Sequence, residues 1–407
     1  MLYHLFEFLQ DEYNLAGASI FKYISFRASA SVLLSLLFSI VFGKRIIRTI
    51  SNKQIKENVR KLGLKDEETK EGTPTMGGII IILSILFSTL LLCNLTNIYV
   101  KIMLLTTVWL GVIGFIDDYI KVFKKNKAGL SGKFKIFGQI TLALIVGLVI
   151  VFNDDITIKE KQRVKIDDQD KTIVVFSESP KKSSKTTIPF FKNNEFDYKS
   201  LTRWIGNDFE NYAWVLFVLI VVFIVTAVSN GANMTDGLDG LATGVSSIIG
   251  ITLAVFGYVS GNIIAADYLN IMYIPNSGEI VIFLSAFVAS CVGFLWHNSY
   301  PADIFMGDTG SLTIGGIIAV SAILIRKELL IPIFCGVFLI QNLSVIIQVA
   351  YFKYTKKKTG VGRRVFLMSP IHHHFQKKGI HENKIVLRFW IIALLFAVIS
   401  ILTLKIR

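Results

Sequence analysis

Residues 213–229 read AWVLFVLIVVFIVTAVS, a largely apolar run without a charged side chain, and the polar sequence NGANMTDGLDG follows at once at 230–240. A helix needs about 17 to 25 apolar residues to cross the hydrocarbon core of a bilayer. In lipid the backbone polar groups must be satisfied within the segment, so the run predicts a membrane-spanning helix. The chain therefore places acidic and amide side chains directly at the end of a span.

Similar runs recur along the chain and predict ten spans in all. Their expected positions are 24–43, 77–96, 99–116, 135–152, 213–229, 241–260, 279–297, 312–325, 329–352 and 386–404. We expect an all-α integral membrane protein in which the cytoplasmic loops form the active site. Its single membrane domain comprises spans one to four in 1–152 and spans five to ten in 213–407, and 153–212 form an insertion between them.

The composition excludes several other classes of protein. Of 407 residues, 53% are hydrophobic and 18% are charged, against about 25% charged in ordinary soluble domains. The net charge is +14, but the basic residues lie between apolar runs and not on a polar scaffold, so we expect no nucleic-acid partner. The three cysteines lie in apolar stretches without metal-type spacing and are interpreted as buried structural thiols. The N-terminus lacks the pattern of a cleaved signal peptide.

The basic residues gather in three connections, those after the first, third and ninth spans. These loops hold 25 of the 43 Lys and Arg residues. By the positive-inside rule the odd-numbered loops are assigned to the cytoplasm. Both termini are then expected outside.

The longest even-numbered connection, 153–212, contains 11 basic and 11 acidic residues. Its charge balance agrees with placement outside the cytoplasm. The strand-like TIVVF at 172–176 favours a small ordered extracytoplasmic insertion over a flexible loop.

Acidic residues end several of the spans on the odd-loop side. Asp117 and Asp118 close the third span, and Lys121 follows within one turn. A pair of carboxylates at the rim of a bilayer needs water or cations. A solvated helix end is the plain alternative, but anions beside cations at a membrane surface fit a site for phosphate and metal.

Two further loops add carboxylates. The loop after the fifth span carries Asn230, Asn233, Asp236 and Asp239; its D-G-x-D-G pattern lacks the alternation and the final Glu of an EF-hand, which disfavours calcium. The loop after the seventh span contains Asp303 and Asp308 and no basic residue. Asp308 is either a helix N-cap or a magnesium ligand.

The loop after the ninth span reads SPIHHHF at 369–375. Consecutive residues of a helix point about 100° apart, so three histidines cannot easily share one ion, and a zinc site is disfavoured. Imidazoles among lysines and arginines favour recognition of a diphosphate. GTPTMGG at 72–78 lacks the Gly-Lys-Ser/Thr of a Walker loop, yet its backbone N–H groups suit a phosphate. Together these loops predict Mg²⁺-assisted phosphoryl transfer at the cytoplasmic membrane surface, with one substrate in the bilayer and one in the cytosol.

At these motifs the sequence resembles the phospho-N-acetylmuramoyl-pentapeptide transferases, a family within the polyprenyl-phosphate N-acetylhexosamine-1-phosphate transferases (glycosyltransferase family 4). The stretches that carry the resemblance are GTPTMGG at 72–78, GFIDDYIKV at 114–122, NMTDGLDGLA at 233–242, GFLWHNSYPADIFMGDTGSL at 293–312, SVIIQV at 344–349, SPIHHHF at 369–375 and RFWI at 388–391. The resemblance implies transfer of phospho-MurNAc-pentapeptide from UDP-MurNAc-pentapeptide to undecaprenyl phosphate, which gives lipid I and UMP with Mg²⁺ as cofactor. It also implies a multi-pass protein of the bacterial inner membrane.

The resemblance implies roles for particular residues. Asp117, Asp118 and Asp308 match catalytic carboxylates, with Asp308 as the metal ligand; whether Asp117 is a base, a metal partner or a positioning group stays open. The expected substrate-binding residues are Lys70, Thr75, Lys121, Lys133, Asn230, Asn233, Asp236, Asp239, Asn298, Phe305, Gly307, Gln348, Ser369, His372 and His373. Direct attack by the lipid phosphate is favoured over a covalent carboxyl-phosphate intermediate.

Two departures and two alternatives accompany this interpretation. Ser369 stands where the family often has Ala, and the insertion 153–212 is long for the family. A sister enzyme that transfers GlcNAc-1-phosphate shares the acidic motifs, but the intact PIHHHF stretch favours the muramoyl-pentapeptide substrate. A lipid-linked sugar transporter would carry polar groups at mid-span and on both faces, whereas the polar motifs of this chain lie in the odd-numbered loops. The resemblance is compatible with a homodimer and with contacts to other cell-wall synthesis proteins.

Overall fold

Helices make up most of the structure. The computed structural model describes residues 1–53, 70, 72–126, 128–165, 172–177, 179–189 and 195–405. Within these residues nine helices are long and apolar enough to cross a membrane. They contain α2 (Ile24–Lys53), α4 (Ile98–Val122), α5 (Gly132–Phe152), α7 (Ala213–Thr235), α8 (Leu241–Gly261), α10 (Gly278–Asn298), α11 (Gly307–Leu324), α13 (Gly336–Thr359) and α15 (Glu382–Thr403). The expected all-α membrane protein is confirmed.

Two of the ten expected spans, 77–96 and 329–352, differ from the sequence prediction. The range 77–96 contains α3 (Gly78–Leu92), which has only 15 residues. The range 329–352 is not one helix, because η5 (Glu328–Leu330) and α12 (Ile331–Phe334) precede α13. Pro332 lies in the first turn of α12, where its missing N–H costs no intrahelical hydrogen bond.

The helix α11 forms the centre of the bundle. All its side chains from Thr309 to Leu324 are buried, and it packs against α3, α4, α7 and α8. Glycines allow this close packing: a Cβ on Gly315 would lie 2.7 Å from the Cα of Ser229, and one on Gly316 would lie 2.0 Å from the side chain of Leu110. Small residues at helix contacts are typical of membrane bundles. The start of α11, which carries Asp308, is therefore held firmly from several sides.

The insertion is an ordered structure in its described part. Strands β1 (Lys161–Lys165) and β2 (Thr172–Phe176) pair antiparallel, as do β3 (Lys185–Thr187) and β4 (Glu195–Asp197). The short helices α6 (Tyr198–Ile205) and η4 (Asn207–Tyr212) lead from β4 into α7. Backbone pairing of Ile158 with Lys181 and of Lys159 with Tyr273 ties the insertion together and to the bundle.

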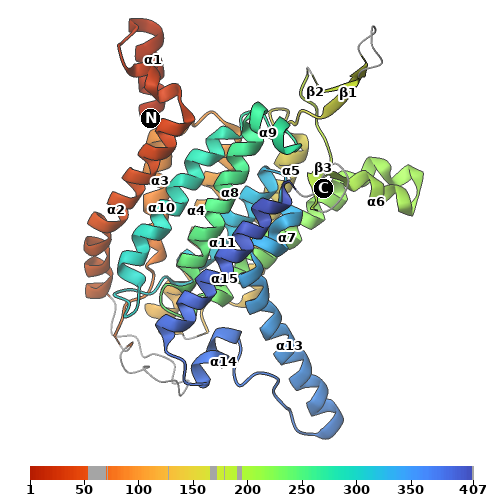
Figure 1. Cartoon of the computed structure of the whole chain (residues 1–407). Helices are drawn as coiled ribbons and strands as arrows, with labels where there is room; N and C mark the ends of the chain where they lie inside the picture. The colour runs from red at the N-terminus through yellow and green to blue at the C-terminus, as the bar shows by residue number, and fades with distance from the viewer. Residues whose placement is uncertain are drawn as a thin grey trace.

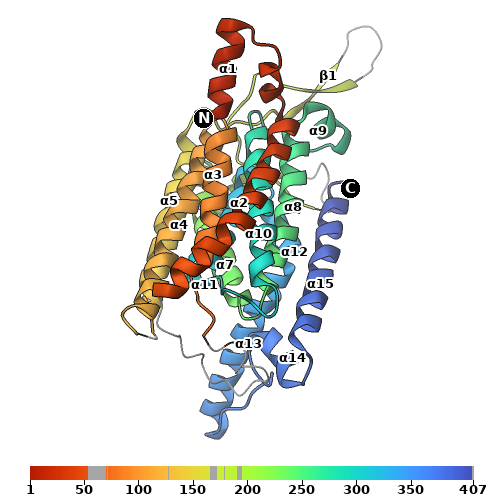
Figure 2. The same ribbon diagram turned by 90° about the vertical axis from the view of Figure 1, so that its left-hand side faces the viewer.

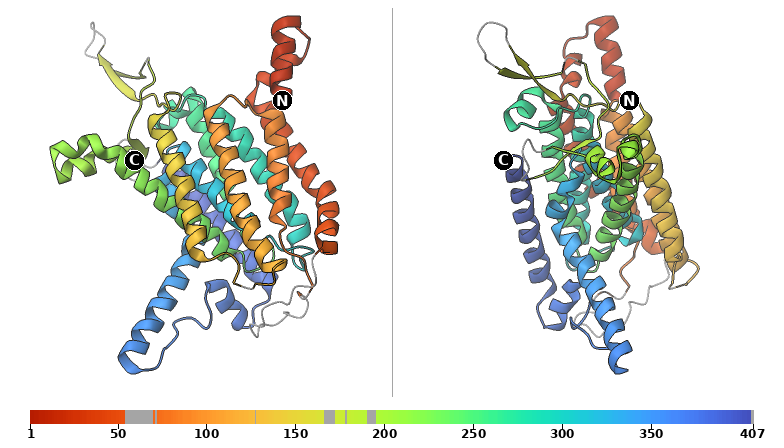
Figure 3. Two further views of the ribbon diagram at one scale, coloured as in Figure 1. Left: turned by 180° about the vertical axis from the view of Figure 1, so that it is seen from behind. Right: turned by 90° about the vertical axis from the view of Figure 1, so that its right-hand side faces the viewer.

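The elements outside the spans gather at two opposite ends of the bundle. The N-terminal helix α1 (Leu2–Tyr13), the short helix α9 (Ile263–Leu269) and the β1–β2 hairpin lie at one end (Figures 1 and 2). The helix α14 (Ile371–Lys377) and the projecting end of α13 lie at the other (Figures 1 and 3). From α14, α15 runs back toward the insertion, so both chain termini lie away from α14.

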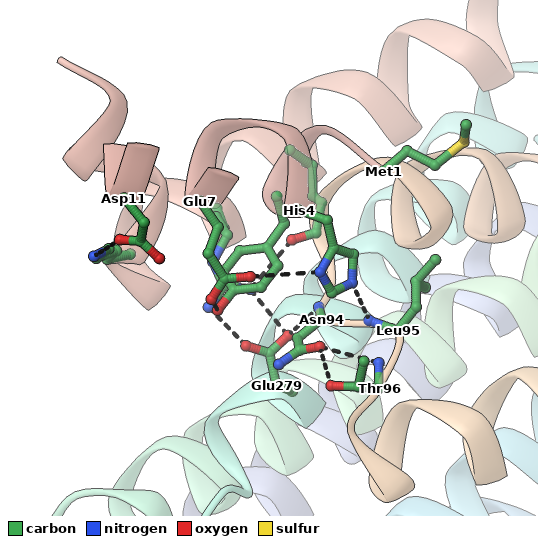
Figure 4. A network of polar contacts seen from close by, with 12 residues as sticks. Met1, His4, Glu7, Asp11, Asn94, Leu95, Thr96 and Glu279 are labelled. Carbon is green, nitrogen blue, oxygen red and sulfur yellow. Dashed lines mark hydrogen bonds and ion pairs between the residues drawn. The ribbon is translucent and has the colours of Figure 1, made fainter. Parts of the chain in front are cut away.

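A polar network anchors the N-terminus (Figure 4). The side chain of His4 accepts a hydrogen bond from the N–H of Leu95 at 3.2 Å. The buried guanidinium of Arg27 donates to both carboxylate oxygens of Glu279, at 2.6 and 2.9 Å. Glu279 also accepts from the N–H of Asn94 at 2.8 Å. The network joins α1, α2, α10 and the loop after α3 at the end of the bundle far from α14.

Candidate active site

Asp117 and Asp118 lie in the last two turns of α4, and both side chains are buried. Gly114, one turn earlier, allows α4 to pack on the start of α11. A Cβ on Gly114 would lie 2.3 Å from the carbonyl oxygen of Asp308. The close contact of these two helices brings all three carboxylates together.

Asp118 receives hydrogen bonds from the N-terminus of α11. It accepts from the N–H of Asp308 at 3.1 Å, and from the N–H and hydroxyl of Thr309 at 2.8 and 2.6 Å. The first N–H groups of a helix lack intrahelical partners, and the helix dipole favours a carboxylate there. Gly307 lies at this contact with a φ of 73°, and a Cβ on it would lie 2.5 Å from Asp118 Oδ2. Asp118 therefore fixes the backbone that carries Asp308.

The three carboxylates lie close enough together to share one ion. Asp117, Asp118 and Asp308 each offer an oxygen within 4.8 Å of the others. Two lysines offset part of their negative charge: Lys121 contacts Asp117 and lies 3.3 Å from Asp308, and Lys135 lies 2.9 Å from Asp117 and also contacts Asp308. Three carboxylates at this spacing repel one another unless cations intervene. The group can therefore hold a divalent cation.

Lys135 contacts the carboxylates, whereas the sequence prediction named Lys133, and not Lys135, as a substrate-binding residue. Lys133 is exposed, and no contact with the carboxylates is found for it among the described residues. Both residues lie in the first turns of α5, two positions apart and therefore on different sides of the helix. The pattern of basic residues indicated a lysine-rich segment near the site, but it did not indicate which lysine contacts the carboxylates.

Asn233 on α7 contacts Asp308 directly. Its side-chain amide donates to Asp308 Oδ1 at 2.9 Å and to the hydroxyl of Ser311 at 2.8 Å. Asn230, three residues earlier, donates instead to the side chain of Gln139 at 3.0 Å. Of these two predicted residues, only Asn233 has its amide in contact with the carboxylate group.

Asp236 follows α7 and is partly buried. Burial raises the pKa of Asp236 well above its ordinary value, and the negative charges of Asp308, Asp118 and Asp239 raise it further. Asp236 therefore keeps a proton more readily than an ordinary aspartate.

A second charged group is built around Lys70. Its ammonium contacts Asp239 and Glu382, both at 2.7 Å, and lies 5.9 Å from the ring centroid of Phe305. Burial alone would lower the pKa of Lys70, but the charges of Glu382 and Asp239 outweigh it and raise the pKa. Asp239 also accepts from the N–H of Ala302 at 3.2 Å. The sequence prediction missed Glu382, because it lies just ahead of the last apolar run, where a charge signals only a helix end.

The GTPTMGG stretch pairs with the loop that precedes Asp308. Pro74 accepts from the N–H of Phe305 at 2.8 Å, and Gly77 donates to the carbonyl of Phe305 at 2.8 Å. A Cβ on Gly307 would lie 3.0 Å from the hydroxyl of Thr75. Thr75 and Phe305 therefore lie between the Lys70 group and the three aspartates.

Two other predicted residues, Asn298 and Gln348, hold neighbouring loops through their side-chain amides. Asn298 bridges the backbone of Gly240 and Ile304 at 3.1 and 2.9 Å. Gln348 accepts from the N–H of Phe366 at 2.9 Å and donates to its carbonyl at 3.1 Å. Ser369 is partly buried beside the start of α14. The side chains of Asn298 and Gln348 are occupied by these contacts.

The three histidines have different partners, although the rings of His372 and His373 contact each other with centroids 4.2 Å apart. His372 is buried, with Nδ1 at 3.0 Å from Gln341, and its Nε2 has no hydrogen-bond partner among the described residues. His373 lies 2.7 Å from Gln376, while His374 accepts from the N–H of Leu367 at 3.1 Å. Burial lowers the pKa of His372 well below its ordinary value. A Cβ on Gly237 would lie 2.2 Å from His372 Nε2, so α14 packs directly on the D-G-x-D-G loop.

Comparison with known proteins gives consistent matches. A family model described as glycosyl transferase family 4 matches residues 100–326, and signature 1 of phospho-N-acetylmuramoyl-pentapeptide-transferase matches residues 70–82. The chain is 59% identical to the phospho-N-acetylmuramoyl-pentapeptide-transferase of Flavobacterium psychrophilum, 57% identical to that of Parabacteroides distasonis and 53% identical to that of Porphyromonas gingivalis. Each alignment covers 100% of both chains.

Proposed function

The chain belongs to the phospho-N-acetylmuramoyl-pentapeptide transferase family, and we propose that it transfers phospho-MurNAc-pentapeptide from UDP-MurNAc-pentapeptide to undecaprenyl phosphate. The products are lipid I and UMP. The observation that carries the proposal is the group of Asp117, Asp118 and Asp308 beside Lys121 and Lys135, at one end of an apolar bundle. Such a site can receive one substrate from the bilayer and one from water.

Mg²⁺ is the proposed cofactor. The donor set fits it, because Mg²⁺ binds through one or two carboxylates and substrate phosphates, and three carboxylate oxygens lie within 4.8 Å of one another. Asp308 would hold the ion, with Asp117 beside it. When bound, the ion supplies charge stabilisation to the phosphate oxygens.

In the proposed step an oxygen of the lipid phosphate attacks the phosphorus attached to the sugar. The bond from that phosphorus to the oxygen of UMP breaks, so one pyrophosphate linkage replaces another. Lys121 and Lys135 already contact the carboxylates, and they are placed to bind phosphate oxygens once the substrates enter. Asn233 orients Asp308, and Asp118 holds the start of α11.

The Lys70 group and the His372 loop are proposed to bind the nucleotide and sugar-peptide parts. Lys70, Asp239 and Phe305 combine a cation, an acceptor and an aromatic ring within 5.9 Å, which suits a uridine and its phosphates. His372 and His373 stay neutral at neutral pH, since burial lowers both pKa values. Neutral imidazoles can donate to or accept from a substrate without repelling Lys70.

We place the site on the cytoplasmic face of the inner membrane and both termini outside. The described parts of the loops rich in Lys and Arg lie at the end of the bundle that carries α14 (Figure 1), where α4 ends and α11 begins. The positive-inside rule supports this orientation. In the same orientation 1–152 and 213–407 form one membrane domain, and 153–212 lie outside. A homodimer and contacts with other cell-wall synthesis proteins are part of the proposal.

The test measures UMP release by the purified protein supplied with undecaprenyl phosphate, Mg²⁺ and one donor at a time. We expect release with UDP-MurNAc-pentapeptide and none with UDP-GlcNAc. Release with UDP-GlcNAc alone would assign the chain to the sister reaction, and release with neither donor would contradict the proposed activity.

A further inference from the structure

A pocket of about 260 Å³ lies at the end of the bundle opposite the three aspartates. Its walls come from the last turn of α5, the first turns of α7 and the insertion, and they include Ile150, Trp214 and Ser183. Because α5 and α7 are apolar spans that end and begin here, the pocket lies at the boundary between hydrocarbon and water. It has no part in the site described above.

Arg326 supplies a buried positive charge to this pocket. The residue is 6% exposed and lines the pocket, with its guanidinium 5.0 Å from the ring centroid of Phe217. Among the described residues the guanidinium makes no hydrogen bond or ion pair. The neighbouring Glu328 attracts Arg326 only from beyond ion-pair distance, and its carboxylate accepts a hydrogen bond from Tyr198 at 3.0 Å. A buried cation without an anionic partner is costly, which points to a ligand of negative charge.

Two lysines add positive charge at the rim. Lys182 and Lys199 line the pocket and are exposed. Lys182 pairs with the solvent-exposed Asp154 at 2.8 Å, and Lys199 lies 3.7 Å from Glu210. Exposed pairs of this kind are weak, so both ammonium groups remain able to turn toward an anion. With Glu210 as the only acidic residue of the lining, the pocket is net positive.

The surroundings of the pocket are apolar and aromatic on the side of the spans. Phe152 and Trp214 are exposed at the ends of α5 and α7 and pack edge to face. The helix α6 projects sideways from the bundle (Figures 1 and 3) and exposes Leu201 and Trp204, the latter at 89%. Tryptophans at the ends of spans are typical of the membrane interface, and a short amphipathic helix beside them lies in that plane.

We propose that this pocket binds the phosphate-bearing headgroup of an anionic phospholipid from the leaflet opposite the catalytic site. Arg326 contacts the phosphate, Lys182 and Lys199 close over it, and the acyl chains descend along Phe152 and Trp214. A free phosphate would satisfy the same cations, but the exposed aromatic side chains at the mouth of the pocket fit acyl chains and favour a lipid.

The test is photocrosslinking of the full-length protein in bilayer nanodiscs that contain phosphatidylglycerol with a photoreactive acyl chain. Labelled peptides are mapped by mass spectrometry. We expect labelling of 150–156 and 208–217 that is at least about 5-fold stronger than with the matching phosphatidylcholine. Arg326→Gln should lower that labelling about 5-fold, and labelling near the basic loops at the other end should stay unchanged.

Lys22→Gln is the matched control, because Lys22 is exposed at the same end of the molecule and pairs with Asp11, outside the pocket. If Arg326→Gln fails to fold, Lys199→Gln at the rim replaces it, with a lower labelling of the same peptides expected. Equal labelling by the two lipids, or labelling unaffected by the variant that folds, would overturn the proposal. Loss of phosphatidylglycerol labelling on addition of millimolar inorganic phosphate would identify a free-anion site instead and would also overturn it.

Discussion

The adjacent residues Asp117 and Asp118 have different hydrogen-bond and ion-pair partners. Asp118 is held by three hydrogen bonds from Asp308 and Thr309, so it positions the start of α11. Asp117 instead contacts Lys121 and Lys135 and accepts from the N–H of Leu130 at 2.7 Å. We therefore propose that Asp117, and not Asp118, is the member of the pair that a substrate phosphate would approach through the lysines.

Lys135 is predicted to matter for turnover although Lys133 was the residue expected from sequence. Lys135→Met removes the cation between Asp117 and Asp308, and we expect kcat for UMP release to fall at least about 10-fold. Lys124→Met is the matched control, since Lys124 is an exposed lysine of the same basic loop, and it should stay near wild type. Equal losses in the two variants would show that general positive charge, and not this contact, supports the reaction.

At the residue scale the sequence predicted which acidic residues belong to the candidate site, but it did not predict which residues contact one another. Adjacent carboxylates at a span end, and Asp308 at a helix start, were visible in the pattern. That Asp118 receives the N–H groups of α11 was not, because Asp118 and Asp308 are 190 residues apart in the chain. Glu382 was missed because a charge just ahead of an apolar run signals only a helix end, and its partner Lys70 lies 312 residues away.

Among the elements, α14 joins two parts of the site. Its His372 is buried against Gly237 and Gln341, and Gln376 donates to Glu382 at 3.3 Å. The sequence predicted that three helical histidines point apart, but the rings of His372 and His373 contact each other at 4.2 Å between centroids, and His374 packs on Phe366 instead. The sequence did not predict which histidine is buried, because that depends on packing against α13 and the D-G-x-D-G loop.

The burial of His372 predicts a pH dependence of stability. Burial lowers the pKa of His372, and the nearby His373 and Lys70 lower it further, so below about pH 6.5 the unfolded chain binds a proton that the folded chain does not. Stability is therefore level above that pH and falls as the pH decreases. We expect the apparent Tm to drop less between pH 7 and 5.5 in His372→Gln than in the wild type.

His381→Gln is the control for this measurement, because His381 is exposed at the start of α15. It should show the same drop in Tm as the wild type. An unchanged drop in His372→Gln would mean that His372 is not the group whose protonation destabilises the fold.

At the scale of the whole molecule, the basic loops and the candidate active site lie at the same end of the bundle. The three basic loops hold 25 of 43 Lys and Arg residues, and the described parts of these loops lie at the end that carries Asp308 and α14. The apolar runs predicted the spans because lipid imposes a fixed length and internal hydrogen bonding. The docking of the insertion could not be predicted, since it depends on contacts such as Thr187 with the carbonyl of Arg326 at 3.1 Å.

Sidedness is tested by cysteine labelling in whole cells. Ser179→Cys in the insertion should react with an impermeant maleimide from outside, and Lys133→Cys should react only after permeabilisation; both positions are exposed. The native Cys93, Cys291 and Cys335 are buried and give a low background. The reverse pattern of labelling would invert the proposed orientation.

The central claim, that Asp308 and its neighbours form the catalytic centre for phosphoryl transfer, is tested most directly by the turnover of Asp308→Asn. The variant removes the charge proposed to hold Mg²⁺, and we expect kcat for UMP release to fall at least about 100-fold. Asp303→Asn is the matched control from the same loop: its side chain is 70% exposed and lies 3.9 Å from His297, so its turnover should stay near wild type. Wild-type turnover in Asp308→Asn would remove Asp308 from the site and contradict the account.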